Sequence, residues 1–188
     1  CLDAGCGEGY YLRQLTAAAS QRGQDLAVLG LDISKWAVLA AAKQDRRPNW
    51  VVGSNAKLPV LPATLDRVLC MFGFPVYAEF ARVLMPGGEL LQVDAGPDHL
   101  RELREIIYPT LKPERAAEPL SPAGFSVQPG DSLRYTVALE GAEQIGDLLT
   151  MTPHLYRASA EGREKAAALT ALSLTVDVCL TRFRREAP

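Results

Sequence analysis

The sequence predicts an α/β protein with a mostly parallel sheet and helices on both of its faces. Short apolar segments alternate with amphipathic segments along the 188 residues, which is the pattern of repeated strand–helix–strand units. The chain also opens on such a unit: Leu2 and Asp3 end a buried strand, a turn with three glycines follows, and a helix runs from about Glu8 to Ser20. Both observations indicate a fold that binds its ligand where the strands end.

The remaining elements follow from apolar periodicity and from turn residues. We expect further strands at residues 27–31, 50–53, 65–71, 89–94, 133–139 and 174–183. We expect helices at 35–44 with Ser34 as its cap, at 76–84, from the Gly96-Pro97 turn to about Tyr108, at 142–149 and at 160–169. Four prolines within residues 109–122 indicate an exposed connection.

Composition places the chain among ordinary globular proteins. With 48% hydrophobic and 22% charged residues it can bury a sizeable core, so we expect a single domain over residues 1–188. It contains no apolar run long enough to span a membrane and no signal peptide. Its four cysteines form no C-x-x-C pair, which predicts neither a metal site nor a disulfide framework and favours a reducing, cytoplasmic compartment.

The start of the chain is unusual for a complete protein. There is no initiator methionine, and residue 1 already lies inside a strand. A buried parallel strand needs residues before it, so we expect the chain to be the C-terminal part of a longer protein, with its first strand truncated.

The spacing of the glycine turn indicates the kind of ligand. The pattern is D-x-G-x-G-x-G, beginning at Asp3, whereas dinucleotide-binding turns use G-x-G-x-x-G, which disfavours an NAD-dependent oxidoreductase. Asp3 and Glu8 would oppose a phosphate but suit a ligand with an amine and a sulfonium, such as S-adenosylmethionine (SAM). We therefore assign Asp3, Gly5 and Gly7 to cofactor binding. The alternative is a turn that only joins a strand to a helix.

Polar residues follow the next two expected strands. Asp32 ends the second strand, where one carboxylate can accept both hydroxyls of a ribose. Its alternative role is to cap the next helix, which Ser34 can also do. Asn55 and Ala56 follow the third strand, where an amide side chain and a backbone N–H can read the edge of an adenine; the alternative for Asn55 is a plain turn residue.

These residues together carry a resemblance to known proteins. The segments 3–9, Asp32, 55–59 and 82–91 resemble the class I SAM-dependent methyltransferases, a Rossmann-like fold with a seven-stranded sheet and an antiparallel last strand. More narrowly, the segments 5–11, 31–35, 96–100 with 107–108, and 151–157 resemble the RlmA (RrmA) family. Those enzymes methylate N1 of a guanine in a hairpin loop of 23S rRNA.

The resemblance implies further site residues and partners. Cys6 and Gly7 would contact SAM through their backbone, and His99 would be another cofactor contact; without the family it would be a surface histidine in a turn. Family members also carry an N-terminal zinc-binding module and a cofactor-contacting tyrosine ahead of the glycine turn, and neither lies in this sequence. Zinc is therefore expected only in that module.

The expected chemistry is attack of a guanine ring nitrogen on the SAM methyl group, with loss of the N1 proton. The target pocket should lie beside the ends of the fourth and fifth strands. Phe72 and Phe74 could stack on an unpaired base, or one of them could pack in the core. Asp94 is our candidate for the proton acceptor; the alternative is that Asp94 is only a turn residue beside a helix. Phe-Gly-Phe-Pro lacks the polar head of the motif in amino-directed methyltransferases, which disfavours chemistry on an exocyclic amine.

Residues 151–157 should form a loop over the site, where Tyr156 offers a stacking ring and Arg157 a phosphate contact, or a loop held by a buried Tyr156. The net charge of −2 argues mildly against RNA as the substrate, although basic clusters occur locally. A small-molecule methyltransferase and a non-catalytic SAM-binding module therefore remain alternatives to methylation of 23S rRNA. A homodimer also remains open, because no pairing surface can be read from the sequence.

Overall fold

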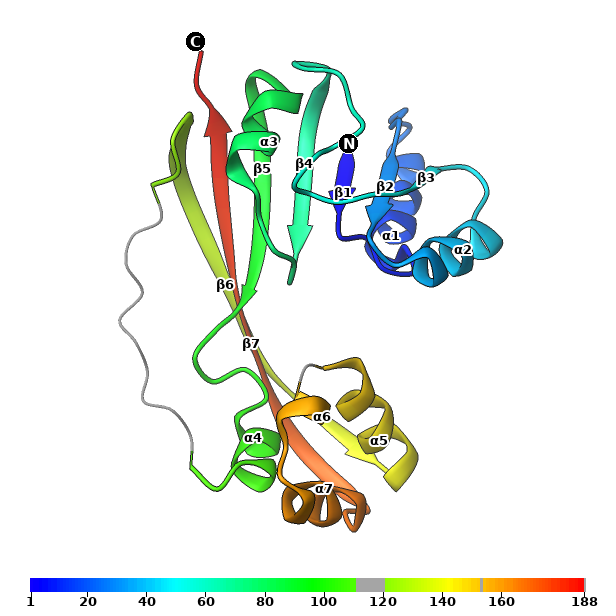
Figure 1. Ribbon diagram of the computed structural model, residues 1–188, viewed down its shortest axis with the longest axis vertical. Coiled ribbons are helices and arrows are strands. Elements are labelled where there is room, and N and C mark those ends of the chain that lie inside the picture. Colours follow the sequence, from blue (N-terminus) through cyan, green and yellow to red (C-terminus); the bar gives the residue numbers. More distant parts are fainter. Residues whose placement is uncertain (111–120, 153, 188) are drawn as a thin grey trace. The chain divides into compact units, whose positions relative to one another are not determined.

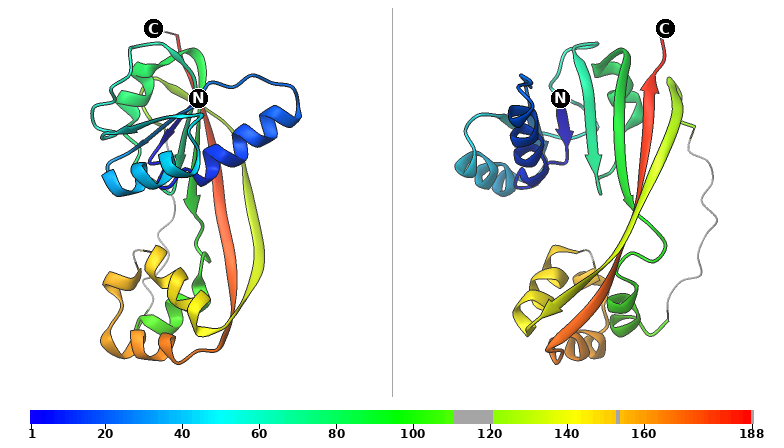
Figure 2. Two further views of the ribbon diagram at one scale, coloured as in Figure 1. Left: turned by 90° about the vertical axis from the view of Figure 1, so that its right-hand side faces the viewer. Right: turned by 180° about the vertical axis from the view of Figure 1, so that it is seen from behind.

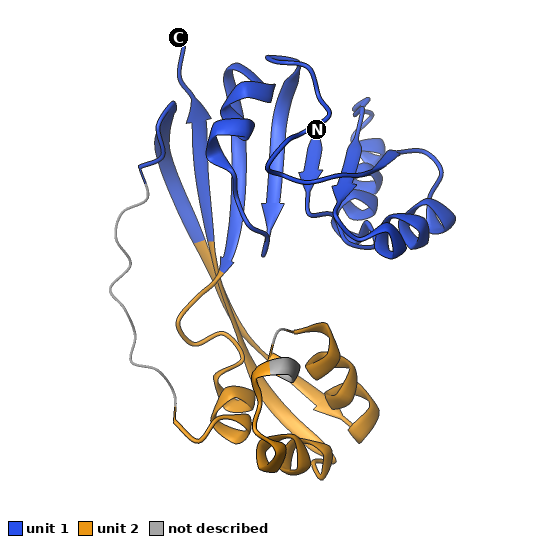
Figure 3. Ribbon diagram, in the orientation of Figure 1, with its two compact units in different colours: residues 1–94, 119–131, 180–188 blue, residues 95–118, 132–179 orange. Residues whose placement is uncertain are grey.

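The computed structural model describes residues 1–110, 121–152 and 154–187, without the side chains of residues 155 and 156. The chain divides into two compact units, coloured separately in Figure 3. Unit 1 comprises residues 1–94, 119–131 and 180–188, and unit 2 comprises residues 95–118 and 132–179. No helix in the described part of the chain is long and apolar enough to cross a membrane.

One seven-stranded sheet contains every labelled strand, in the order β3-β2-β1-β4-β5-β7-β6. Its strands are β1 (Leu2–Ala4), β2 (Leu29–Asp32), β3 (Asn49–Val52), β4 (Leu65–Met71), β5 (Leu84–Ala95), β6 (Phe125–Glu140) and β7 (Ala171–Arg185). The first five pair in parallel, and β7 runs opposite to β5 beside it (Figure 1). The predicted fold, a mostly parallel sheet with an antiparallel last strand, is confirmed.

In unit 1 the helices cover both faces of the sheet. They are α1 (Tyr10–Gln21), α2 (Lys35–Gln44) and α3 (Tyr77–Val83). Figures 1 and 2 show α1 and α3 on opposite faces of the strands. Ser34 caps α2 as expected, since its hydroxyl oxygen accepts a hydrogen bond from the Ala37 N–H at 3.3 Å.

The core of unit 1 fills the space between α3 and the central strands. Fully buried side chains from β1, β4, β5 and α3 form it, among them Leu2, Val68, Leu90 and Phe80. Three aromatic rings extend this core: Tyr77 meets Phe125 and Phe183 edge to face, with ring centroids 6.4 and 5.8 Å apart. Such pairs add to the free energy gained by apolar burial, so they hold the start of α3 firmly against β6 and β7.

Unit 2 has a small core of its own. It holds α4 (Arg101–Ile107), α5 (Ala142–Met151), α6 (His154–Arg157) and α7 (Ala160–Ala167), together with the adjoining parts of β6 and β7 (Figure 2). Leu103, Ile107, Ala166 and Leu174 are buried in it. Gly162 lets α7 approach α4, because a Cβ at this position would overlap the backbone of Ile107.

The structure differs from the sequence-based expectation in three places. Strand β5 begins at Leu84 instead of residue 89, because Leu84 pairs with Leu65 before the register shifts, so the Pro-Gly-Gly segment lies within the strand. Strand β6 begins at Phe125 instead of residue 133. The expected loop at 151–157 contains the short helix α6. Most of the expected connection at 109–122 falls on residues 111–120, which lie outside the described residues.

Candidate active site

The glycine turn after β1 is tied to the end of β2. The N–H groups of Gly5 and Cys6 both donate to the Leu31 carbonyl oxygen, at 2.8 and 2.9 Å. Gly5, Gly7 and Gly9 have φ values of +101°, +52° and +76°, which side chains rarely tolerate. The turn is therefore held in a conformation that needs glycine.

The three glycines serve two different purposes. A Cβ added at Gly5 or Gly7 would meet no atom within 4 Å, so their Cα faces are open to a ligand. A Cβ at Gly9, or at Gly30 in β2, would overlap the indole ring of Trp50 from β3. The Trp50 N–H donates to the Asp45 carbonyl oxygen at 2.7 Å, which fixes the ring in place. Gly9 is thus required by packing and not by the ligand.

Asp32 links the glycine turn to α2. One of its carboxylate oxygens accepts from the Gly7 N–H at 2.9 Å, and the other accepts from the Ser34 N–H at 2.8 Å. Each oxygen retains capacity for a second hydrogen bond, because an ionised carboxylate has about four acceptor positions. Asp32 lines the pocket described below, and its contact with the ribose hydroxyls stays a prediction. The cap of α2 is Ser34, and Asp32 accepts from the N–H of that cap residue instead of from an N–H of the helix.

Asp3 is a buried acid without a described partner. Its side chain is fully buried, and neither carboxyl oxygen has a hydrogen bond among the described residues. Burial first, and the neighbouring Asp32 carboxylate second, raise the pKa of Asp3 to about 7. Two unsatisfied oxygens in a protein interior are costly, and a site that later receives a donor or a cation explains such an arrangement.

Cys6 turns its side chain inward, beneath the turn. Burial, with smaller contributions from Asp3 and Asp32, raises the pKa of its thiol to about 12. A thiol that stays protonated is a poor nucleophile and a poor metal ligand. The predicted contact between the Cys6 backbone and SAM does not involve the thiol, and it stays a prediction.

A pocket of about 360 Å³ opens beside the glycine turn. Its wall comprises Gly5, Leu31, Asp32, Ile33, Ser54, Asn55, Ala56, Met71, Phe72, Gly73, Phe74 and Val76. This volume lies at the lower end of the range for small-molecule sites. Of the predicted cofactor residues, Gly5, Asp32, Asn55 and Ala56 are brought together here.

Asn55 braces two parts of the pocket. Its amide nitrogen donates to the carbonyl oxygens of Ala4 at 3.4 Å and Phe74 at 3.2 Å. Its side-chain oxygen is buried and has no partner among the described residues. A ligand with a hydrogen-bond donor would satisfy that oxygen. If Asn55 were a plain turn residue, the burial of this oxygen without a described partner would have no explanation.

The loop that carries Asn55 and Ala56 is fixed from α3. Glu79 accepts from the Leu58 N–H at 2.7 Å and from Arg82, and Arg82 donates to the Leu58 and Val60 carbonyls at 2.9 and 2.8 Å. The hydrogen bonds from Arg82 hold the pKa of Glu79 down at about 2. Segments 55–59 and 82–91, which both carried the family resemblance, are thus connected by hydrogen bonds.

Phe72 and Phe74 both line the pocket and neither is buried, with 47% and 89% of their surfaces exposed. Core packing, the alternative that we had for one of them, does not apply. Phe72 has a φ of +54°, a strained conformation for a residue with a bulky side chain. Its N–H donates to the Val93 carbonyl oxygen at 2.8 Å, which holds the end of β4 against β5. Base stacking by these rings stays a prediction.

Asp94 belongs to a buried polar network that the sequence analysis missed. The Tyr77 hydroxyl donates to the Gln92 side-chain oxygen at 2.8 Å, and the Gln92 amide nitrogen donates to an Asp94 carboxylate oxygen at 2.6 Å. Burial, with a smaller contribution from Asp94, raises the pKa of nearby Cys70 to about 11. The available signal was a glutamine within the apolar sequence of β5, since a buried amide requires partners.

The other predicted site residues belong to unit 2. The 96–99 turn is built around Asp177 of β7: its carbonyl oxygen accepts from the Gly96 N–H at 2.8 Å and its carboxylate from the Asp98 N–H at 3.0 Å. The ring nitrogen of His99 accepts from the Asp177 N–H at 3.3 Å. Burial lowers the pKa of His99. Its predicted contact with the cofactor stays a prediction.

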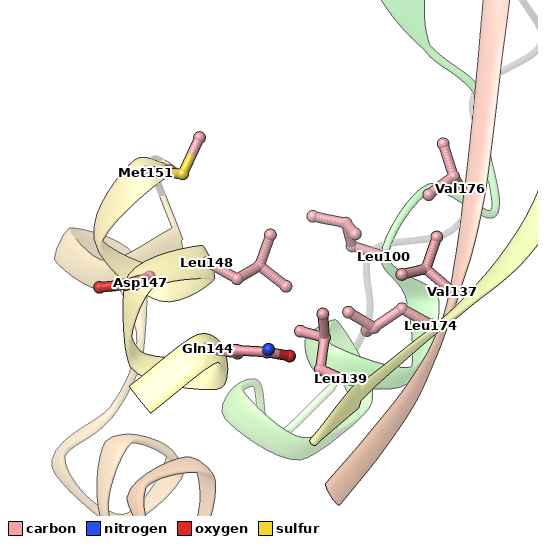
Figure 4. Close-up of a pocket in the computed structure, with 9 residues that line it drawn as sticks. All are labelled: Leu100, Val137, Leu139, Gln144, Asp147, Leu148, Met151, Leu174 and Val176. Atoms are coloured by element: carbon pink, nitrogen blue, oxygen red, sulfur yellow. The ribbon is translucent and has the colours of Figure 1, made fainter. Parts of the chain in front are cut away.

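Arg157 is exposed at the end of α6, while the Tyr156 side chain lies outside the described residues. The described residues contain no group of three histidine, cysteine or acidic side chains suited to a metal ion. Unit 2 also holds a hollow of about 300 Å³ with a mostly apolar wall (Figure 4). Leu100, Val137, Leu139, Leu148 and Leu174 contribute to this wall, and none of them was predicted to form a site.

Comparison with known proteins agrees with this geometry. The family model described as "Methyltransferase domain" matches residues 1–88. The chain is 33% identical over 182 residues to YxjB of Bacillus subtilis, which is named as a candidate 23S rRNA (guanine-N1)-methyltransferase. It is 30% identical over 189 residues to the 23S rRNA (guanine(748)-N(1))-methyltransferase of Streptomyces fradiae.

These matches cover 94% and 95% of the chain but 64% and 65% of the two relatives, so the chain spans somewhat less than two thirds of their length. Its fold resembles that of a SAM-dependent methyltransferase from Mesorhizobium loti, with a TM-score of 0.52, 16% identity, and coverage of 98% of this chain and 89% of that one.

The chain is thus similar to class I SAM-dependent methyltransferases in sequence and in fold. The predicted resemblance to 23S rRNA (guanine-N1)-methyltransferases is confirmed at the level of sequence relationship. The cofactor that this family and fold imply is SAM.

The residues around the glycine turn fit that cofactor. Asn55, in the pocket wall, has a side-chain oxygen without a partner among the described residues, which suits a hydrogen-bond donor. Asp3 does not line the pocket; it is buried just before the glycine turn, and its oxygens, also without a described partner, suit a cationic group. Gly5 and Gly7 leave their Cα faces open, where side chains would otherwise fill the space above the turn. A positively charged ligand that carries an amine, hydroxyls and an aromatic base has a complementary group for each of these features.

Proposed function

We propose that this chain is the methyltransferase domain of an enzyme that transfers a methyl group from SAM to N1 of a guanine in a hairpin loop of 23S rRNA. The observation that carries the proposal is the pair of unpartnered side chains, Asp3 and Asn55, beside an open glycine turn, in a chain related to such enzymes. We further propose that residues 1–188 act as one domain, because β5, β6 and β7 contribute residues to both units.

The residues of the pocket divide the work of cofactor binding. Asp3 attracts the cationic amino acid end, Asp32 accepts from the ribose, and Asn55 and Ala56 read the base edge. SAM, when bound, supplies a methyl group on a positively charged sulfur. Gly5 and Gly7 allow it to lie directly on the backbone, which keeps the reacting atoms in register with the substrate.

Asp94 is the proposed proton acceptor. SAM would supply the methyl group, with its sulfur as the leaving group, and guanine N1 would accept that methyl group. The N1 proton passes to the Asp94 carboxylate. A general base of this kind contributes roughly 10²–10⁴-fold to a rate.

The exposed rings of Phe72 and Phe74 are proposed to stack on an unpaired guanine, and Arg157 and Tyr156 are proposed to contact the flanking RNA. We propose that an N-terminal module with zinc adds RNA affinity in the longer protein, and that the protein works in the cytoplasm. A homodimer is a further proposal.

A small-molecule substrate is the second candidate function. The observation in its favour is the net charge of −2, since proteins that bind RNA on their own are usually basic. This candidate predicts methyl transfer in an extract that has been freed of RNA.

Transfer of tritium from labelled SAM to 23S rRNA tests the proposal. The rRNA should come from a strain that lacks the endogenous activity, and the chain should be compared with the full-length protein. Label that maps to N1 of one guanine is the expected result. Binding of SAM without any label in RNA, from either protein, would contradict the proposal and favour the small-molecule candidate.

A further inference from the structure

The network formed by Tyr77, Gln92 and Asp94 has a defined direction. A carboxylate only accepts hydrogen bonds, so the Gln92 group that faces Asp94 must be the amide nitrogen, which is 2.6 Å away. The amide oxygen then faces Tyr77, whose hydroxyl donates to it at 2.8 Å. Reversing the amide would place its oxygen against the carboxylate and remove that hydrogen bond. The Asp94 carboxylate therefore fixes the direction of the amide, and the Tyr77 hydroxyl holds its other end.

The network is rigid because the core holds both of its inner members. Gln92 is 4% exposed and sits in β5 opposite Cys70 of β4. The Tyr77 ring is packed against Phe125 and Phe183. A site residue supported by strands and packed rings is held more precisely than one supported by a loop.

The network also distinguishes the two oxygens of Asp94. Gln92 occupies one of them, the oxygen Oδ2. The other oxygen, Oδ1, is then the better proton acceptor, because protonation there leaves the hydrogen bond from Gln92 intact. Asp94 lies next to Val93, whose carbonyl holds Phe72 of the pocket wall at 2.8 Å. Oδ1 has no hydrogen bond among the described residues, and Asp94 lies at the same strand end, although it is not itself part of the pocket wall.

We propose that Tyr77 and Gln92 are positioning residues that hold Asp94 in a fixed orientation, so that its Oδ1 accepts the N1 proton of the target guanine. This inference rests on the proposed function. It also gives a reason for selectivity: guanine presents N–H donors at N1 and N2, whereas adenine presents an acceptor at N1, which a fixed carboxylate repels.

Three variants test the proposal: Tyr77→Phe, Gln92→Leu, and Tyr135→Phe as the matched control. Tyr135 belongs to unit 2 and is 48% exposed, so the control removes a hydroxyl without touching the network. The measurement is single-turnover methyl transfer to the rRNA substrate between pH 5 and 9, together with the Kd for SAM.

In Gln92→Leu we expect the single-turnover rate constant to fall by about tenfold or more across this pH range, with the Kd for SAM unchanged, because the carboxylate loses its fixed orientation. Tyr77→Phe should show a smaller loss, and Tyr135→Phe should match the wild type. An unchanged rate constant in Gln92→Leu, or a loss confined to SAM affinity, would overturn the proposal.

A second readout does not depend on the substrate. In protein labelled with ¹³C at the aspartate carboxyl groups, the Asp94 resonance should change its chemical shift in Gln92→Leu and keep its wild-type position in Tyr135→Phe. An unchanged resonance in Gln92→Leu would overturn the positioning role even in an active enzyme. If the wild type transfers no methyl group to RNA, yet the Asp94 resonance changes in Gln92→Leu, the proposed function is refuted and the network is not.

Discussion

The pocket of unit 1 and the hollow of unit 2 have similar volumes, about 360 and 300 Å³, but their walls differ in polarity. The first contains backbone, an amide and a carboxylate beside two glycines, with the buried acid Asp3 beneath. The second is lined mostly by leucine and valine side chains. Unsatisfied polar atoms reduce stability, so they persist where a ligand will satisfy them. Volume alone therefore does not identify a site, whereas unpaired polar atoms do.

The largest effect should come from Asp3→Asn. The pKa of Asp3 is about 7 in the folded protein and 3.8 in the unfolded chain, so the unfolded state loses its proton first and the free energy of unfolding falls as pH rises from 4 to 7. The size of this loss is on the order of 4 kcal/mol. The difference in unfolding free energy between wild type and variant should therefore change by that amount between pH 4 and 8, measured by urea denaturation.

The same pair of proteins gives a ligand readout. SAM should bind wild type more tightly as pH rises through 7, because the ionised Asp3 attracts a cation, and Asp3→Asn should lose both affinity and this pH dependence. A stability difference that does not change with pH would mean that Asp3 is not a buried titrating group, and would weaken the contrast between the two pockets.

The next largest effect should come from Gly9→Ala. The new methyl group would overlap the Trp50 ring, and the residue has a φ of +76°, so we expect a loss of about 3 kcal/mol in unfolding free energy. Gly23→Ala is the matched control, with a φ of +66° and no atom near its Cβ. It should lose only about 1 kcal/mol. Equal losses of unfolding free energy in the two variants would show that the Trp50 ring can move aside at little cost.

Gly7→Ala separates ligand binding from stability. Its φ of +52° and its open surroundings predict the same loss of about 1 kcal/mol as Gly23→Ala. Its methyl group, however, would occupy the face offered to SAM. Calorimetry should find SAM affinity reduced by more than about tenfold in Gly7→Ala, a cost above 1.4 kcal/mol, and unchanged in Gly23→Ala. Undiminished affinity in Gly7→Ala would place the cofactor elsewhere.

The smallest effect should come from Leu148→Phe, which adds apolar volume to the hollow of unit 2. We expect the unfolding free energy to change by less than about 1 kcal/mol, because a larger apolar side chain has space there. SAM affinity should not change. A loss of SAM binding, measured by the same calorimetry, would give this hollow a part in the site.

Local sequence patterns predicted the parts of the fold and site that are built from neighbouring residues. The strand, glycine turn and helix at residues 2–21 show this, as does the Ser34 cap. The long-range partners were not predictable. Trp50 reaches Gly9 from the other side of β2, and Tyr77 reaches Gln92 across the sheet.

Element boundaries failed where pairing outweighed local signals. Pro86, Gly87 and Gly88 normally mark a turn, yet pairing between Leu84 and Leu65 draws them into β5. The first half of β6 contains Pro129 and Gly130, and the strand was expected only from residue 133. Gly130 fits there because a Cβ would meet the Leu180 carbonyl oxygen of β7 at 2.6 Å. Only the neighbouring strand reveals that requirement.

Trp50 also makes the glycine turn visible to spectroscopy. The chain has two tryptophans, and Trp36 is 77% exposed on α2, whereas the Trp50 ring lies beneath Gly9 and Gly30. A soluble quencher such as acrylamide should suppress the emission of Trp36 first. The remaining fluorescence then comes from the one ring that supports the turn. If the turn moves when a ligand binds, the fluorescence of Trp50 should change. Binding can then be followed without a label.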